Sequence, residues 1–137
     1  MAIINWTEEY SVGVAELDKQ HQQLINIINQ LYALYADKKF DKINVEPIFK
    51  ELLDYADYHF STEEHYFNLY NYANKEQHFA LHESYRQKII GLKKEYDSNN
   101  SEKTLFAINN YLNDWWTWHI NNVDKEYVAY FNANGLK

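Results

Sequence analysis

Hydrophobic residues recur every three or four positions in four separate blocks of this chain, which is the period of one face of an α-helix. The four stripes consist of Leu17, His21, Leu24, Ile28, Leu31, Tyr35; Ile48, Leu52, Tyr55, His59, Glu63, Tyr66, Tyr70; His78, His82, Tyr85, Ile89, Leu92, Tyr96; and Leu105, Ile108, Leu112, Trp115, His119, Val123, Tyr127, Tyr130. They predict helices over about residues 16–37, 44–71, 74–97 and 101–133, after a non-helical N-terminal arm over about residues 1–15. Short connections between long helices favour antiparallel neighbours, so the predicted fold class is all-α, an up-down-up-down antiparallel four-helix bundle.

The breaks between the predicted helices contain residues that commonly begin or end helices. Pro47 falls in the expected first turn of the second helix, where its missing N–H matters little. Asn74 and the segment 97–101 offer side chains that can cap a helix N-terminus, and Gly135 is suited to close the last helix. The length of 137 residues fits a single domain, residues 1–137.

Composition narrows the classes of protein that remain. The net charge of −7 argues against nucleic acid and against an anionic membrane surface as partners. Since cysteine is absent, disulfides, iron–sulfur clusters and thiolate zinc sites are excluded. No segment approaches the roughly 20 apolar residues of a membrane span, and the first residues lack the pattern of a signal peptide. We therefore expect a cytoplasmic protein, as a monomer, with an oligomer left open.

The apolar stripes contain residues that should not be there. Each of the four includes histidine, and the second also includes Glu63. Burial of an unpaired ion costs several kcal/mol even after the surroundings relax. One histidine in an apolar row is more often a hydrogen-bonded core residue than a ligand, but the same anomaly on all four helices predicts a shared metal site inside the bundle.

The spacing of these residues suggests how they would meet. His59 and Glu63 are four residues apart, and so are His78 and His82, so each pair projects from one helix face. On an α-helix, the five-residue step from His119 to Asp124 gives an angular offset of roughly 140°, which makes them poor ligands for one small ion. A carboxylate that reaches across to a second metal explains this spacing better.

With His21 from the first helix, the candidate ligands are five imidazoles and two carboxylates, too many for one tetrahedral zinc but suited to two octahedral ions. Imidazole with carboxylate suits iron, zinc, copper or nickel. Carboxylate-rich di-iron bundles use Glu-x-x-His pairs, and no histidine here follows a glutamate at that spacing. Fewer anionic ligands should stabilise high-valent iron less, so our hypothesis is reversible dioxygen binding rather than oxidative attack on a substrate.

Several segments resemble the hemerythrin family, in particular its bacterial single-domain branch. They are the opening Ser11-Val-Gly-Val-Ala-Glu-Leu-Asp-Lys-Gln-His21, then His59-Phe-Ser-Thr-Glu63-Glu64, His78-x-x-x-His82 and His119-x-x-x-x-Asp124-Lys-Glu-Tyr127. The resemblance covers roughly residues 6–131 and fills all seven of the family's ligand positions in order. It therefore implies a role for each of these positions.

By this resemblance, one iron would be held by His78, His82 and His119, and the other by His21 and His59. Glu63 and Asp124 would bridge the two irons beside an oxo or hydroxo group. Dioxygen would bind at the two-histidine iron, where it is reduced to a bound hydroperoxide. The expected ligand pocket consists of Trp115, Trp116, Thr117 and Val123, in a region where relatives usually carry aliphatic residues.

Other readings stay open at this point. The same site could belong to a di-iron oxidase, a peroxidase or a nitric-oxide-processing enzyme, or to a sensor of oxygen or redox state. His65 matches no ligand position and is expected at the surface. Asp18 and Glu64 are expected to be solvated or to orient imidazoles, Glu64 more so. The tyrosines of the stripes are expected to pack in the core with their hydroxyls satisfied.

Overall fold

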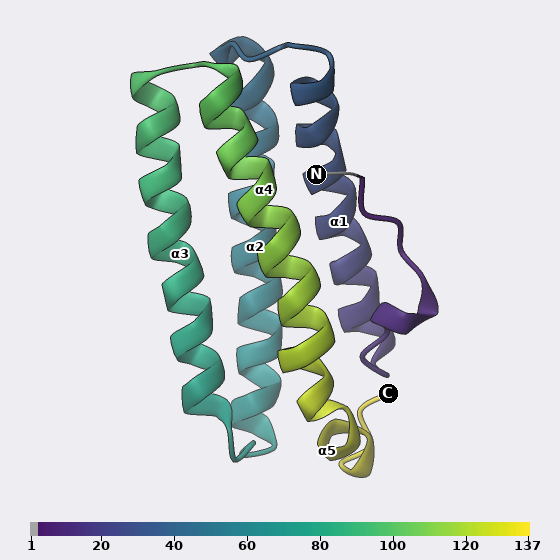
Figure 1. Cartoon of the computed structure of the whole chain (residues 1–137). Coiled ribbons are helices and arrows are strands. Elements are labelled where there is room, and N and C mark those ends of the chain that lie inside the picture. Colours follow the sequence, from purple (N-terminus) through teal and green to yellow (C-terminus); the bar gives the residue numbers. More distant parts are fainter. Residues whose placement is uncertain (1–2) are drawn as a thin grey trace.

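The computed structural model describes residues 3–137 and contains four long helices, with no strand among these residues. They are α1 (Ala15–Ala36), α2 (Lys42–Leu69), α3 (Lys75–Ser98) and α4 (Glu102–Trp118). Figure 1 shows them side by side, each antiparallel to the next along the chain. The predicted all-α, up-down-up-down four-helix bundle is confirmed.

The interior of the bundle differs between its two halves. Around the C-terminal half of α1, it is filled by apolar side chains such as Leu31, Phe49, Leu105 and Ile108, none more than 1% exposed. Around the N-terminal half of α1, helices α1, α2 and α3 and the segment after α4 bury histidine and carboxylate side chains as well. Because burial of a large apolar side chain is worth about 1.5–3 kcal/mol, the apolar half supplies the stability that the polar half lacks.

The helices end in a recurring way. After α1, α2 and the final helix, one residue adopts a left-handed backbone: Lys38 (φ 58°), Asn71 (φ 51°) and Gly135 (φ 89°). The following N–H then bonds back to a carbonyl in the last turn, at 2.9 Å in each case: Lys39 to Leu34, Tyr72 to Phe67 and Leu136 to Phe131. This is the Schellman motif, which satisfies carbonyls that the helix would otherwise leave unpaired.

The N-terminal ends of the helices match the predictions from the sequence only in part. Ser101 precedes α4 and exchanges hydrogen bonds with Thr104 in a capping box. Asn74 precedes α3, although its side chain makes no capping bond. Pro47 does not lie in a first turn as predicted, because α2 begins at Lys42. Its missing N–H falls opposite the carbonyl of Ile43, whose side chain is 85% exposed, so water can take the place of the lost helix bond.

The predicted fourth helix over residues 101–133 is not continuous. After α4, the chain forms a π turn at His119–Val123 and a 3₁₀ turn at Asp124–Tyr127, and only then the short helix α5 (Val128–Ala133). The backbone N–H of Asp124 donates to the carbonyl of His119, five residues earlier. Figure 1 shows α5 turned away from the axis of α4 at the end of the bundle.

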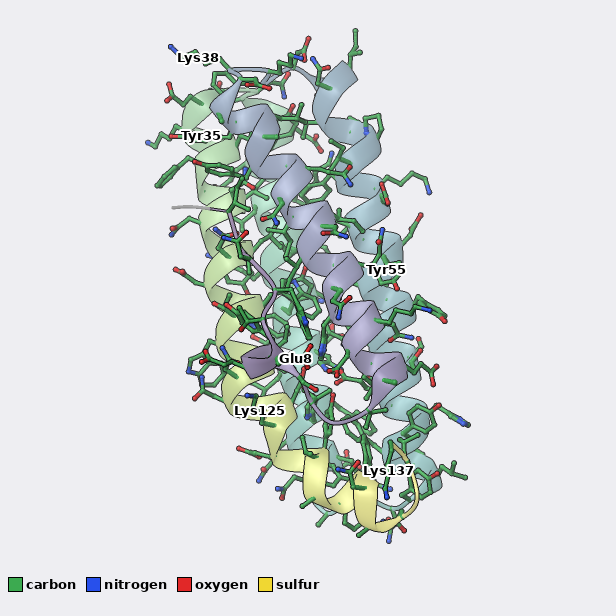
Figure 2. The ribbon with its side chains drawn as sticks, turned by 90° about the vertical axis from the view of Figure 1, so that its right-hand side faces the viewer. Glu8, Tyr35, Lys38, Tyr55, Lys125 and Lys137 are labelled. Atoms are coloured by element: carbon green, nitrogen blue, oxygen red, sulfur yellow. The ribbon has the colours of Figure 1, made fainter. Side chains whose placement is uncertain are left out.

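The N-terminal arm lies against the bundle and contains one 3₁₀ turn, Glu8–Tyr10. Figure 2 shows it running down beside α1, with Glu8 close to Lys125, whose ammonium group donates to the carbonyl of Glu9. At Gly13 (φ +67°), a Cβ would lie 2.8 Å from Val128, so this close approach to α5 requires glycine. Among the described residues, no helix is long and apolar enough to cross a membrane.

Replacing Lys38 by glycine should stabilise the protein. Lys38 is exposed and holds a left-handed backbone that an L side chain disfavours, so we expect a gain of about 0.5–1 kcal/mol in the free energy of unfolding. Urea denaturation measures it. Lys39→Gly is the matched control, since Lys39 is exposed but lacks a positive φ, and it should give no gain. Equal effects of the two substitutions would contradict the assignment.

Candidate metal centre

All seven residues singled out as ligands lie together inside the polar half of the bundle. His21 comes from α1, His59 and Glu63 from α2, and His78 and His82 from α3. His119 and Asp124 come from the π turn and from the residue that follows it. Six of the seven side chains are 0% exposed, and His78 is 3% exposed. We refer to these seven residues as the cluster.

At one end of the cluster, three ligand atoms form a nearly equilateral triangle. Asp124 Oδ1 lies 3.0 Å from His78 Nε2 and 3.0 Å from His119 Nε2, and the two imidazole nitrogens are 3.2 Å apart. Adjacent ligands at about 2.1 Å from one octahedral ion are about 3.0 Å from each other. The triangle therefore has the dimensions of one face of an octahedral coordination site.

The two carboxylates connect this end of the cluster with the other. Asp124 Oδ2 lies 3.1 Å from His21 Nε2, while Oδ1 faces His78 and His119. Glu63 Oε1 lies 3.4 Å from His59 Nε2 and 3.3 Å from His82 Nε2. Two overlapping groups of ligand atoms result, each within 4.8 Å: Glu63, His78, His82, His119; and His21, His59, Glu63, Asp124. Such an arrangement can hold two ions that share carboxylates.

Six of the atoms that face the centre have no hydrogen-bond partner within residues 3–137. They are His21 Nε2, His59 Nε2, His82 Nε2, Glu63 Oε1, and Asp124 Oδ1 and Oδ2. Although some of them approach each other to 3.0–3.4 Å, the angles are not those of hydrogen bonds. A buried polar atom without a partner costs about 1–3 kcal/mol. These atoms fit a site for metal ions, which would coordinate all of them at once.

The π turn brings His119 and Asp124 onto one face. On an α-helix, residues five apart would diverge, and on that basis the sequence predicted that they would be poor ligands for a single ion. That expectation is wrong, because the i to i+5 bond makes the two residues one turn apart. Their ligand atoms lie 3.0 Å from each other.

Two polar side chains contact imidazoles of the cluster at Nδ1, the ring nitrogen that faces away from the centre. His82 Nδ1 lies 2.8 Å from Glu64 Oε2, as the sequence suggested for Glu64. His59 Nδ1 lies 2.7 Å from Gln20 Oε1. Because the amide nitrogen of Gln20 donates to Thr62 at 3.2 Å, its oxygen is the atom presented to His59. Each imidazole thus donates through Nδ1 and turns Nε2 toward the centre, which is the usual orientation of a metal-bound histidine.

Tyr127 reaches the cluster through its hydroxyl, which donates to Glu63 Oε2 at 2.7 Å. Burial and the adjacent Glu63 raise the pKa of Tyr127 well above its ordinary value, so the phenol keeps its proton. The sequence placed Tyr127 in the core with a satisfied hydroxyl, but did not show that its partner is a member of the cluster. The bond restrains the carboxylate that both groups of ligands share.

The ionisation of the cluster suits metal ligands. Burial lowers the pKa of His59 to about 3, so this imidazole is neutral. Burial and Asp124 raise the pKa of Glu63, but the imidazoles around it outweigh both effects and lower it to about 2. Burial likewise opposes ionisation of Asp124, but His119 and the other imidazoles hold its pKa well below the usual range. Both carboxylates are therefore anionic at neutral pH, as coordination requires.

His82 differs from His59. Burial lowers its pKa, but the carboxylates of Glu63 and Glu64 outweigh this effect and raise the pKa to about 9. Without a cation in the centre, His82 therefore carries a proton at neutral pH and partly balances the two buried carboxylates. A metal ion would take over this role and displace the proton.

Aromatic rings enclose the cluster. Phe60 stacks on His82 with ring centroids 3.9 Å apart, and Trp115 stacks on His119 at 4.2 Å. Trp116 is fully buried beside His59, at 5.9 Å. The sequence did not single out Phe60, whose position directly after His59 was the available signal. The rings exclude water from the centre and strengthen electrostatic interactions inside it.

Two members of the predicted ligand pocket, Thr117 and Val123, differ in their surroundings from the tryptophans that pack on the cluster. The Thr117 hydroxyl donates to the carbonyls of Asn113 and Asp114 in its own helix, and it makes no hydrogen bond to the cluster within the described residues. Val123 is 8% exposed and lies in the π turn. The assignment of Trp115, Trp116, Thr117 and Val123 to a ligand pocket stays a prediction.

Two residues that the sequence set apart from the ligands lie outside the cluster. His65 is exposed on α2, next to the ring of Tyr66. Asp18 orients no imidazole. Its carboxylate accepts from the N–H of Val12 at 2.7 Å and from the Ser11 hydroxyl at 2.5 Å, which fixes the end of the arm to α1.

The fold and the cluster together define a metal-binding four-helix bundle. Residues 12–131 match the family model described as Hemerythrin HHE cation binding domain. The chain therefore belongs to the hemerythrin family.

Individual proteins with similar sequences and structures support the assignment to this family. A bacteriohemerythrin from Clostridium acetobutylicum is 30% identical over 128 residues, covering 90% of this chain and 97% of the relative. A bacteriohemerythrin from Methylococcus capsulatus is 29% identical over 138 residues, covering 97% of this chain and 100% of the relative. The crystal structure of a wild-type hemerythrin superimposes with a TM-score of 0.82 at 26% identity, covering 93% of this chain and 97% of that one.

Removing the hydroxyl of Tyr127 should destabilise the protein. Tyr127→Phe deletes a buried hydrogen bond to the ionised Glu63, so we expect the free energy of unfolding to fall by about 1.5–3 kcal/mol. Urea denaturation of the metal-free protein measures it. Tyr58→Phe, whose ring is 56% exposed, is the control and should leave stability unchanged. Equal stability of Tyr127→Phe and wild type would contradict a role for this bond.

Proposed function

We propose that this protein binds dioxygen reversibly at a pair of iron ions held by the cluster, in carriage, storage or delivery of the gas. The observation that carries the proposal is the arrangement of ligand atoms. Two carboxylates each face imidazoles from both ends of the cluster, and six of the inward atoms lack hydrogen-bond partners among the described residues. When bound, two irons supply the electrons and the open coordination position that reversible dioxygen binding requires.

The count of ligands differs between the two irons that we propose. His78, His82 and His119 would hold one, and His21 and His59 the other, with Glu63 and Asp124 shared. A shared oxo or hydroxo group would complete six positions at the first and leave one free at the second. We therefore expect dioxygen at the end formed by His21 and His59.

The surrounding residues support binding rather than turnover. Gln20 and Glu64 fix the imidazoles of His59 and His82, so the ligands are already oriented before the gas arrives. Trp116 lies beside His59 at the two-histidine end and stacks at 5.5 Å on Phe60, which covers His82, so the two rings exclude water from the centre. Both are apolar at the faces of their rings, and the indole N–H of Trp116 is directed to the hydroxyl of Tyr85 at 3.2 Å.

The central experiment is to load the protein with ferrous iron without oxygen and to follow its absorption spectrum as oxygen is added and removed. We expect two irons per chain and a charge-transfer band that forms with oxygen and disappears on deoxygenation, over repeated cycles. His119→Ala should lose iron and the band, while the exposed His65→Ala should keep both. Loss of the band with consumption of oxygen would instead indicate an oxidase, and absence of iron binding would refute the proposal.

Glu64 should matter for affinity although it is not one of the seven ligands. Glu64→Ala removes the partner of His82 Nδ1, so the imidazole loses its fixed orientation. Loss of such a partner typically weakens metal binding by about 10- to 100-fold, which competition with a chelator measures. Glu51→Ala, an exposed carboxylate of the same helix, is the matched control. Wild-type affinity in Glu64→Ala would remove Glu64 from the site.

A further inference from the structure

The cluster is closed to solvent except at one residue. His78 is 3% exposed, and the other six side chains are 0% exposed. An ion that enters or leaves the centre must pass the protein somewhere, and the surface at His78 offers the shortest way. This exposure lies at the three-histidine end, opposite to the end at which we expect dioxygen.

A hollow of about 210 Å³ leads to His78 from the surface. Its lining residues are Asn74, Gln77, His78, Leu81, Trp118, Val123 and Glu126. They come from the first turns of α3, the end of α4, and the π and 3₁₀ turns after it. Six water molecules occupy roughly 180 Å³ in the liquid, so the hollow has about the size of a hydrated divalent cation.

The chemistry of the rim favours a hydrated cation. Asn74, Gln77 and Glu126 are exposed and line the hollow, so two side-chain amides and a carboxylate stand at its rim. Oxygen atoms of this kind hold hard divalent ions and their water shells. The lysines nearest in sequence are occupied elsewhere, because Lys75 donates to Asn71 and Lys125 donates to the carbonyl of Glu9.

One wall of the hollow is the part of the bundle that departs from α-helical geometry. Val123 closes the π turn, and Glu126 lies in the 3₁₀ turn that follows. Short π and 3₁₀ segments lack the regular ladder of an α-helix, and segments with fewer such bonds open locally at lower free energy. Apart from His119 and Asp124, the members of the cluster come from long, continuous helices.

We propose that this hollow is the route by which metal ions enter and leave the centre, with Glu126 and the amides of Asn74 and Gln77 receiving the cation before it passes His78. The proposal rests on the two-metal site proposed above. It separates the path of the metal from the end of the site where dioxygen is expected.

The test measures rates of metal uptake and release, with Co²⁺ alone as the probe. Metal-free protein is mixed with Co²⁺ in a stopped-flow instrument, and release is followed after addition of a chelator. Asn74→Trp places a large ring at the exposed rim, four residues before His78. It should slow uptake and release alike by about tenfold, which corresponds to an activation barrier that is higher by about 1.4 kcal/mol. The dissociation constant should stay unchanged. Glu51→Trp, at an exposed hollow on α2 lined by Pro47 and Lys50, is the matched control.

A second variant makes the test independent of how well the first one folds. Glu126→Gln removes the negative charge at the rim, so uptake and release should both slow at low ionic strength and approach the wild-type rates at high salt. Wild-type rates in both variants would overturn the route, and so would a changed dissociation constant, which would make these residues part of the binding site itself. Failure of the wild-type protein to bind Co²⁺ would instead overturn the two-metal site, so the two failures are distinguishable.

Discussion

The structure depends on the meeting of two anionic carboxylates with five imidazoles in a volume closed to water. Without a bound cation, these groups oppose folding, because six of their inward atoms have no hydrogen-bond partner among the described residues. Several features reduce this opposition. The proton on His82 partly balances the charge of the two carboxylates. The Tyr127 hydroxyl donates a hydrogen bond to Glu63, and Gln20 accepts one from His59. The apolar half of the bundle then provides the free energy that keeps the polar half assembled.

The long helices were predictable because each presents one face to the interior over many turns. The apolar residues therefore recur every three or four positions often enough to be recognised in the sequence. Six members of the cluster were predictable for the same reason, whereas Asp124 lies outside the stripes and was identified through the family resemblance. A histidine or Glu63 in an apolar stripe is an exception that is visible without coordinates. Their positions in the structure follow directly from the stripes.

What the sequence did not reveal depends on local geometry or on contacts between helices. The π turn at His119–Val123 leaves the composition of the fourth block unchanged, so the periodicity suggested one long helix and a divergent Asp124. Gln20 directly precedes the predicted ligand His21, but its partner His59 lies 39 positions further along the chain, on another helix. The sequence alone does not show that these two side chains meet. Pro47 was placed in a first turn because helix starts are uncertain by one or two residues.

The π turn also determines where the chain tolerates a change in length. It contains one residue more per turn than the helix before it, and this extra residue sets the rotational phase of Asp124 relative to His119. Removal of one residue between His119 and Asp124 would leave a four-residue step in a regular helix and keep the carboxylate on its face, whereas one further residue would rotate it by roughly 100°, together with everything that follows. A deletion in the connection at residues 37–41 would leave that phase untouched. The position of the carboxylate therefore depends on the number of residues after His119 together with the kind of turn that they form.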